Sequence, residues 1–174
     1  MPPPDFDLVA EARRNWERHG WDRPEAMAAA TSIARAQQIV LARADAALAP
    51  FGLTFSRFEA LALLFFSRRG ALPMGKVGAR LQVHPTSVTN TVDRLERDGF
   101  VRRAPSDGDR RTVLAEITVE GRRVVVAAAG ALAEASFGLA DLDEGELRRI
   151  HDAILPLRRA AGDFAEAGEA SGRR

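Results

Sequence analysis

The segment 85–98 carries side chains that form directional hydrogen bonds, at a spacing that gathers them on one side of a helix. Pro85 suits the first helical position, because its missing N–H would have no partner there. At about 100° per residue, one side is apolar and consists of Val88, Val92 and Leu95. The opposite side is polar and consists of Thr86, Asn90, Asp93 and Arg97, with Ser87, Thr89 and Arg94 beside it.

Hydroxyls, an amide and arginines are the groups with which proteins contact duplex DNA. A hydroxyl bonds to phosphates or bases, an Asn amide pairs with adenine through two hydrogen bonds, and an Arg pairs with guanine in the same way. The segment therefore fits a helix that reads base edges in a major groove. The solvated face of an ordinary amphipathic helix fits the same pattern, so the helix alone leaves both interpretations open.

A second group of candidate residues lies at the tip of a predicted hairpin. Residues 100–104 and 112–118 are predicted strands, separated by a turn that is rich in Pro, Gly and Asp. The charged residues of interest at the tip are Asp109, Arg110 and Arg111. The arginines could lie along phosphates or enter a narrow minor groove, whose negative potential attracts guanidinium groups, and the Asp could orient the second arginine. A tip that is charged only for solubility is the alternative.

The elements around these residues predict how they are positioned. A helix over 73–81, a tight turn, the helix over 85–98 and the hairpin follow one another in the order of a winged helix-turn-helix. Ser56 and Glu59 have the spacing of a capping box at the start of a buried helix that ends near Phe66. The sequence therefore predicts a mostly α fold with a small β-hairpin wing.

Helices are also predicted on both sides of this region. They are a leading helix that ends near His19, a long alanine-rich helix over 24–48, a helix over 119–137 capped by Thr118, and a helix over 144–164 capped by Asp143 with Glu146. We expect three regions: N-terminal dimerisation helices (1–50), the winged helix-turn-helix (51–118) and C-terminal dimerisation helices (119–174). Together the flanking helices offer more apolar surface than one reading head can cover.

Composition excludes several classes of function. The chain has no cysteine, so it forms no disulfide or thiolate metal site. Its three histidines lack metal-ligand spacing, and no nucleophile elbow or phosphate-binding glycine loop is present, so we expect no enzyme, cofactor or metal. The longest apolar run, 60–66, is far shorter than the roughly 18–20 residues of a membrane span, which predicts a cytoplasmic protein without a membrane partner.

Several motifs together resemble the signature of the MarR family of transcriptional regulators. They are Thr86-Ser87-Val88-Thr89-Asn90, Val92-Asp93-Arg94-Leu95-Glu96, Gly99-Phe100-Val101-Arg102-Arg103, Asp109-Arg110-Arg111, and Ile117-Thr118 with Gly121-Arg122. They follow in order over about residues 51–125. Four positions depart from the family's usual residues, namely Gly75, Gly78, His84 and Asn90.

The resemblance implies a homodimer with interlocked terminal helices, bound to double-stranded DNA at a palindromic operator. It implies that the recognition helix enters the major groove, that Arg111 is the wing residue inserted in the minor groove, and that Asp109 positions it. A repressor that a small ligand releases from DNA is the function expected from the family. A winged helix that has lost its DNA contacts and binds only proteins is the alternative.

The resemblance also suggests where a small anionic or aromatic ligand would bind. Some members of the family line a pocket, between the dimerisation helices and the reading head, with residues of a leading helix. The candidates here are Trp16, His19, Arg35 and Phe58. Tryptophans that simply pack a short helix against the dimer core are the alternative, since large aromatic side chains usually serve burial.

Overall fold

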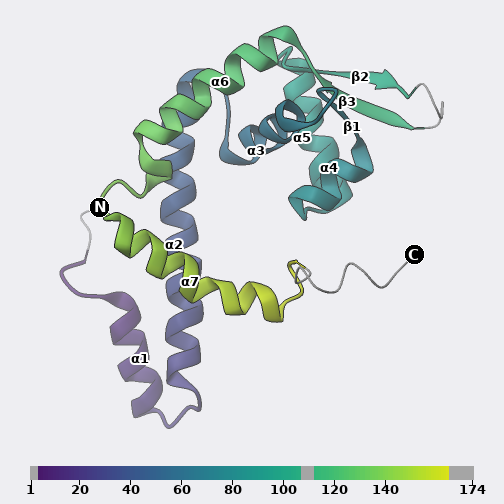
Figure 1. Ribbon diagram of the computed structural model, residues 1–174. Coiled ribbons are helices and arrows are strands. Elements are labelled where there is room, and N and C mark those ends of the chain that lie inside the picture. Colours follow the sequence, from purple (N-terminus) through teal and green to yellow (C-terminus); the bar gives the residue numbers. More distant parts are fainter. Residues whose placement is uncertain (1–3, 107–111, 165–174) are drawn as a thin grey trace. The chain divides into compact units, whose positions relative to one another are not determined.

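The computed structural model describes residues 4–106 and 112–164. Contacts divide the chain into two compact units, Met1–Gly138 and Leu139–Arg174, which are taken separately. The first unit contains α1 (Leu8–Arg18), α2 (Pro24–Leu48), the 3₁₀ turn η1 (Ala49–Phe51), α3 (Phe55–Phe66), β1 (Ala71–Pro73), α4 (Met74–Leu81), α5 (Pro85–Arg97), β2 (Val101–Pro105), β3 (Val113–Ile117), α6 (Val119–Glu134) and the 3₁₀ turn η2 (Ser136–Gly138) (Figure 1). The predicted mostly α fold with a hairpin wing is confirmed.

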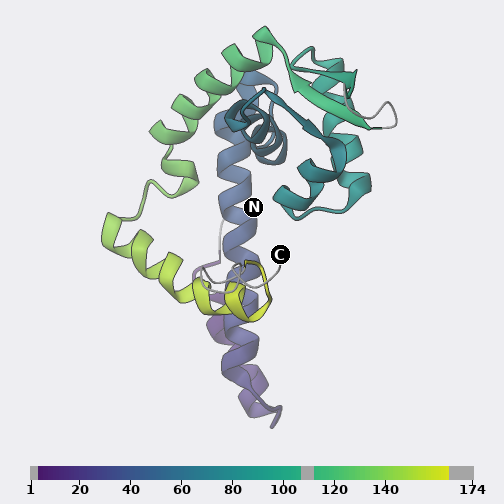
Figure 2. The ribbon, with the colours of Figure 1, turned by 45° about the vertical axis from the view of Figure 1, so that its right-hand side comes forward.

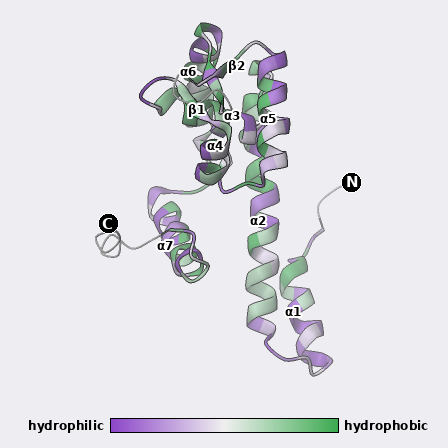
Figure 3. Ribbon diagram, turned by 90° about the vertical axis from the view of Figure 1, so that its right-hand side faces the viewer, coloured by the Kyte–Doolittle hydropathy of each residue, from purple (hydrophilic) through white to green (hydrophobic). Residues whose placement is uncertain are grey.

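The long helix α2 has the predicted bounds, from Pro24 to Leu48. Only its C-terminal part joins the core, where Ala44 and Leu48 are fully buried. Beside its N-terminal part, α1 packs as an antiparallel neighbour (Figures 1 and 2). Pale and green turns are frequent along α2 in Figure 3, and Ile33, Ile39 and Leu41 are exposed there, so apolar surface of α2 remains uncovered by the other described elements of the first unit.

The start of α3 differs from the prediction. Thr54, not Ser56, is the N-cap residue, and no side chain of α3 closes a capping box. Instead the N–H of Phe55 donates to Oδ1 of Asp45 on α2, at 2.6 Å. A carboxylate from a neighbouring helix thus satisfies one of the free backbone N–H groups in the first turn of α3. The predicted capping box at Ser56 and Glu59 is wrong, because the helix already starts at Phe55 and places Ser56 inside its first turn.

The wing is part of a three-stranded antiparallel sheet with the order β1-β3-β2. β2 and β3 form the predicted hairpin, in which Arg103 pairs with Ala115. β1 pairs with the other edge of β3 and was not predicted, because three residues carry almost no local strand pattern. β1 is therefore an edge strand of the sheet, and it leads directly into α4.

One core lies between α3, α5, α6 and the sheet. The apolar residues predicted on the inner side of α5 are confirmed as buried; they are Val88, Val92 and Leu95. α6 begins at its predicted cap, Thr118, whose hydroxyl accepts from the N–H of Gly121. A Cβ built on Gly121 would lie 2.1 Å from the carbonyl oxygen of Phe100, so α6 meets the segment between α5 and β2 backbone to backbone.

The second unit contains α7 (Glu144–Ala160). Its predicted capping box is confirmed: Asp143 accepts from the N–H of Glu146, and the Glu146 carboxylate accepts from the N–H of Asp143. The helix ends four residues before the predicted end, and Gly162 follows with a positive φ of 70°. No single helix in the described ranges is long and apolar enough to cross a membrane; the bent pair Pro24–Phe51 and Phe55–Phe66 reaches that criterion only jointly.

Candidate nucleic-acid interface

The turn before α5 fixes how that helix leaves α4. Gln82 has a left-handed backbone with φ 55°, and the N–H of Val83 donates to the carbonyl of Gly78 at 3.2 Å. A Cβ on Gly78 would lie 3.0 Å from a methyl group of Val88, so the missing side chain allows α4 and α5 to pack closely. This glycine, one of the departures from the family pattern, therefore has a packing role.

His84 serves as the N-cap of α5. Its Nδ1 accepts from the N–H of Thr86 at 3.3 Å, and Pro85 occupies the first helical position. The imidazole thus replaces the small hydroxyl that usually caps such a helix. The recognition helix has a defined start despite this unusual residue.

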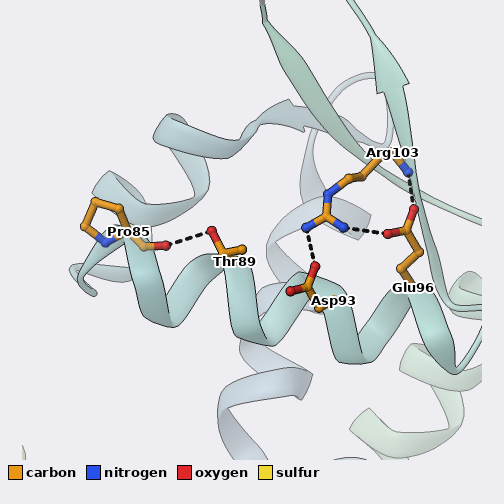
Figure 4. Close-up of polar contacts among 5 residues, drawn as sticks. All are labelled: Pro85, Thr89, Asp93, Glu96 and Arg103. Carbon is orange, nitrogen blue, oxygen red and sulfur yellow. Dashed lines mark hydrogen bonds and ion pairs between the residues drawn. The ribbon is translucent and has the colours of Figure 1, made fainter.

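The polar side of α5 is exposed, but its residues are not equivalent. The outermost side chains are those of Thr86, Asn90 and Arg97, and the structure gives neither Asn90 nor Arg97 a polar partner among the described residues. Thr89 lies toward the wing, and its hydroxyl donates to the carbonyl of Pro85 at 3.1 Å (Figure 4). The outward residues are therefore the ones available to base edges.

Asp93 is held away from that outer row. Nη2 of Arg103, on β2, lies 2.6 Å from Oδ1 of Asp93, and Nη1 of Arg103 lies 2.6 Å from Oε2 of Glu96 (Figure 4). The backbone N–H of Arg103 also donates to Glu96 at 3.0 Å. The hydrogen bond to Asp93 raises the pKa of Arg103, so its charge is fixed. The arginine ties the wing to the recognition helix and offsets part of the negative charge of these two carboxylates.

Sequence reasoning missed this role of Arg103. A signal was present, since Asp93 and Glu96 lie one turn apart on the same side of a helix and need a cation if they face DNA. The sequence did not show which cation pairs with these two carboxylates, because that cation lies on a strand that follows α5 in the chain. Only the packing of β2 on α5 reveals it.

The other flank of α5 faces α3 across a polar hollow of about 220 Å³. Ser87, Asn90 and Arg94 of α5 line it, together with Arg57 of α3, which pairs with Asp98 at 3.1 Å. The structure therefore brings three predicted contact residues together on this side. Thr89 and Asp93 lie on the wing side, away from this hollow.

A deeper hollow of about 320 Å³ lies behind α5, between it and α3. Its wall is mostly apolar, with Val77 and Val92 among the lining residues, and Glu59 is its one carboxylate. Partial burial raises the pKa of the Glu59 carboxyl. The hollow thus has an apolar wall and one carboxyl group, which loses its proton at a higher pH than an exposed carboxyl group does.

The predicted contact residues at the wing tip, Asp109, Arg110 and Arg111, lie outside the described residues. The described strands lead up to them, and the N–H of Ser106 donates to the carbonyl of Thr112 at 3.1 Å. Metal ligation has no basis within residues 4–106 and 112–164, where no three His, Asp or Glu side chains come close enough to hold an ion.

The four predicted ligand-lining residues lie at three separate places. Trp16 packs edge-on against Trp21, with ring centres 4.7 Å apart, and His19 lies near the same ring. Arg35 lies midway along α2 and donates to Gln38, whereas Phe58 is buried in the core of the reading head. Among the described residues, the two hollows beside α5 are lined by none of the four.

Comparisons with known proteins agree with this geometry. The family model described as "MarR family" matches residues 51–112. Sco5413, a MarR family transcriptional regulator from Streptomyces coelicolor, is 56% identical, with a TM-score of 0.76 over 82% of this chain and 99% of that one. The transcriptional regulator PecS of Dickeya dadantii is 31% identical over 65% of this chain and 69% of its own length.

A more distant solved structure carries a ligand. CouR of Rhodococcus jostii RHA1, bound to p-coumaroyl-CoA, is 26% identical, with a TM-score of 0.62 over 77% of this chain and 92% of that one. The curated relatives are helix-turn-helix regulators rather than enzymes. The chain folds as a winged helix-turn-helix and covers 99% of a MarR family regulator to which it is 56% identical. It therefore belongs to the MarR family of transcriptional regulators.

Proposed function

We propose that this chain is a homodimeric repressor that binds a palindromic operator in double-stranded DNA and is released from it by a small ligand. The observation that carries the DNA-binding part is the outer row of α5. Thr86, Asn90 and Arg97 are exposed along one side of a helix whose other side is anchored in the core. Such an anchored helix with free polar groups fits the major groove.

Each part of the polar side has its own role in this proposal. Asn90 and Arg97 read base edges, while Ser87, Thr89 and Arg94 contact phosphates at the groove walls. Asp93 acts through Arg103, to which it is bound. At the wing, Arg111 enters the minor groove, Arg110 follows the backbone and Asp109 positions Arg111, as the sequence predicts.

Dimerisation is supported by the apolar surface that the chain leaves uncovered. Ile33, Ile39 and Leu41 on α2 are exposed by 37–43%, and Ile150 and Leu157 on α7 by 43% and 55%. Large apolar side chains in such number along two helices favour a partner surface. A symmetric pair of reading heads requires half-sites about 10 base pairs apart.

The experiment that tests these statements is selection from a random-sequence duplex pool by the purified chain, with sedimentation of the free protein. We expect a palindromic consensus and a dimer at micromolar concentration. Enrichment of a single isolated half-site, or a monomer, would contradict the dimeric reader. A chain that selects no sequence while still folding would favour the winged helix that binds only proteins.

Repression and ligand release need separate measurements. A reporter under a promoter that overlaps the selected operator should fall in expression when the chain is present; a rise would identify an activator. Ligand release is supported by the relationship to CouR, which is bound to p-coumaroyl-CoA. A screen of anionic and aromatic metabolites should find a compound that raises the melting temperature and dissociates the operator, and a screen without one would leave a constitutive repressor.

A further inference from the structure

A second basic surface lies beside α4, away from the outer row of α5. A hollow of about 430 Å³ is bounded by the turn from α3 to β1 and by one side of α4. Its charged residues are all cations, namely Arg68, Arg69, Lys76 and Arg80, and its other lining residues are apolar except for a serine. We call this surface the basic hollow. Four positive charges gathered without a carboxylate repel one another and favour an anion.

Like Arg97 on the outer row of α5, the cations of the basic hollow lack acidic partners among the described residues. In the described part of the chain, none of the four has a hydrogen bond or an ion pair. By contrast, Arg57, Arg102, Arg103 and Arg123 each pair with a carboxylate at 2.5–3.1 Å. The chain has nearly as many acidic as basic residues, so a cluster without acidic partners is not simply a consequence of composition.

The basic hollow is continuous with the recognition surface. A neighbouring hollow of about 730 Å³ shares Pro73 and Lys76 with it and extends to Thr89 on α5 and Arg103 on β2. A path of exposed surface therefore leads from the recognition helix, past Lys76, to Arg80. Lys76 and Arg80 lie one turn apart on the same side of α4, so they extend this path along the helix.

We propose that the basic hollow binds phosphates of the DNA duplex outside the base pairs that α5 reads, so that affinity depends on the length of flanking DNA. This inference rests on the proposed function, since it needs the recognition helix to be docked on DNA. The contact is independent of sequence, because guanidinium and ammonium groups on phosphates carry no base information. It adds affinity by releasing counterions from the flanking duplex.

The test compares two lengths of one operator duplex, obtained by selection with the wild-type chain. The short duplex ends at the palindrome, about 20 base pairs for two half-sites, and the long one extends by about 10 base pairs on each side. The variant is Arg69→Gln with Arg80→Gln. The matched control is Arg14→Gln with Arg18→Gln, which removes the same charge from exposed positions on α1. Circular dichroism checks that each variant is folded.

On the long duplex, the hollow variant should bind about tenfold more weakly than wild type near 0.1 M salt, and the slope of log affinity against log salt should fall by roughly 0.9 for each lost phosphate contact. On the short duplex the hollow variant should bind with the affinity of wild type. The α1 control should bind both duplexes with the affinity of wild type. Equal affinity of the hollow variant and wild type on the long duplex would overturn the proposal.

Two further outcomes separate the possible occupants and the underlying function. An equal loss on both duplexes would place the hollow inside the minimal operator contact and overturn the flanking role. Tight binding of inorganic phosphate or ATP to wild type but not to the hollow variant, with no effect of duplex length, would assign the hollow to a free anion instead. If the wild-type chain selects no duplex at all, the proposed function fails together with this inference.

Discussion

Arg103 on β2 and Asp93 on α5 form an ion pair that clamps the wing to the recognition helix, with Nη2 and Oδ1 2.6 Å apart. If α5 docks on DNA as proposed, an unpaired Asp93 would repel phosphates, and the arginine offsets its charge. The same guanidinium reaches Glu96, which lies one turn further along α5. The clamp therefore has both a structural and an electrostatic consequence.

Replacing Arg103 by Ala should weaken operator binding more than it weakens the fold. Because the side chain is about one-third exposed, we expect a loss of only about 1 kcal/mol in the free energy of unfolding. Adding Asp93→Asn should restore much of the lost DNA affinity, since the freed negative charge is removed. Arg102→Ala, which breaks the neighbouring pair with Glu116, is the control. Denaturant unfolding and DNA titration of these proteins, together with wild type and Asp93→Asn alone, measure the coupling.

Asn90→Ala should relax base preference at one operator position by about 1–3 kcal/mol, because its amide is exposed on the outer row of α5. Affinity for random-sequence duplex should stay nearly unchanged. The measurement is competition between the selected operator and its single-base variants. An equal loss on every duplex would instead identify Asn90 as a phosphate contact.

Arg111→Ala should weaken binding to operator and to random DNA alike, because a guanidinium in the minor groove acts largely by displacing counterions. The slope of log affinity against log salt should fall by roughly 0.9 per subunit. Asp109→Ala should cause a smaller loss in the same direction if the Asp positions Arg111. A salt titration of wild type and both variants on one duplex decides this, and an unchanged slope for Arg111→Ala would remove the wing from the mechanism.

Gly121→Ala and Gly130→Ala should have opposite effects, although both lie in α6. A methyl group at Gly121 meets the backbone of Phe100, and we expect a loss of roughly 1–3 kcal/mol in the free energy of unfolding. At Gly130 the Cβ meets nothing within 4 Å, so the alanine should add about 0.5–1 kcal/mol. Thermal or urea unfolding of both variants is the measurement; similar effects would contradict the close backbone contact.

Glu59→Gln should change the pH dependence of stability. Partial burial raises the pKa of Glu59, so below about pH 4 both the folded and unfolded chains carry the proton and the group contributes nothing. The pKa of Glu59 is lower in the unfolded chain than in the folded chain. As the pH rises through this lower pKa, Glu59 of the unfolded chain loses its proton first, and the free energy of unfolding falls. The variant lacks that fall and should be more stable than wild type at neutral pH only. The exposed Glu134→Gln on α6 is the control in urea unfolding at several pH values.

Local signals predicted most of the fold. Pro85 and the period of the apolar residues defined α5 within one residue of its observed end, and the bounds of α2 were predicted without error. Apart from the ends of α6 and α7, the wrong or missing features depend on contacts between distant residues. Asp45 caps α3 from another helix, and β1 is a strand only because β3 lies beside it.

The candidate site divides in the same way. The sequence identified the polar side of α5, because helical periodicity alone separates it from the buried side. It did not distinguish Asn90, which remains open to solvent, from Asp93, which is bound to Arg103. That distinction requires the position of β2, and the cations of the basic hollow likewise come from separate elements.

The direct contact of Gly121 with Phe100 joins α6 closely to the segment between α5 and β2. Side chains absorb small displacements by changing rotamer, but here no side chain intervenes between the two backbones. α6 has 16 residues and so spans about 24 Å, which means that a rotation of about 5° at this joint moves its far end by about 2 Å. A displacement at the far end of α6 is therefore transmitted to the segment that leads from α5 to β2.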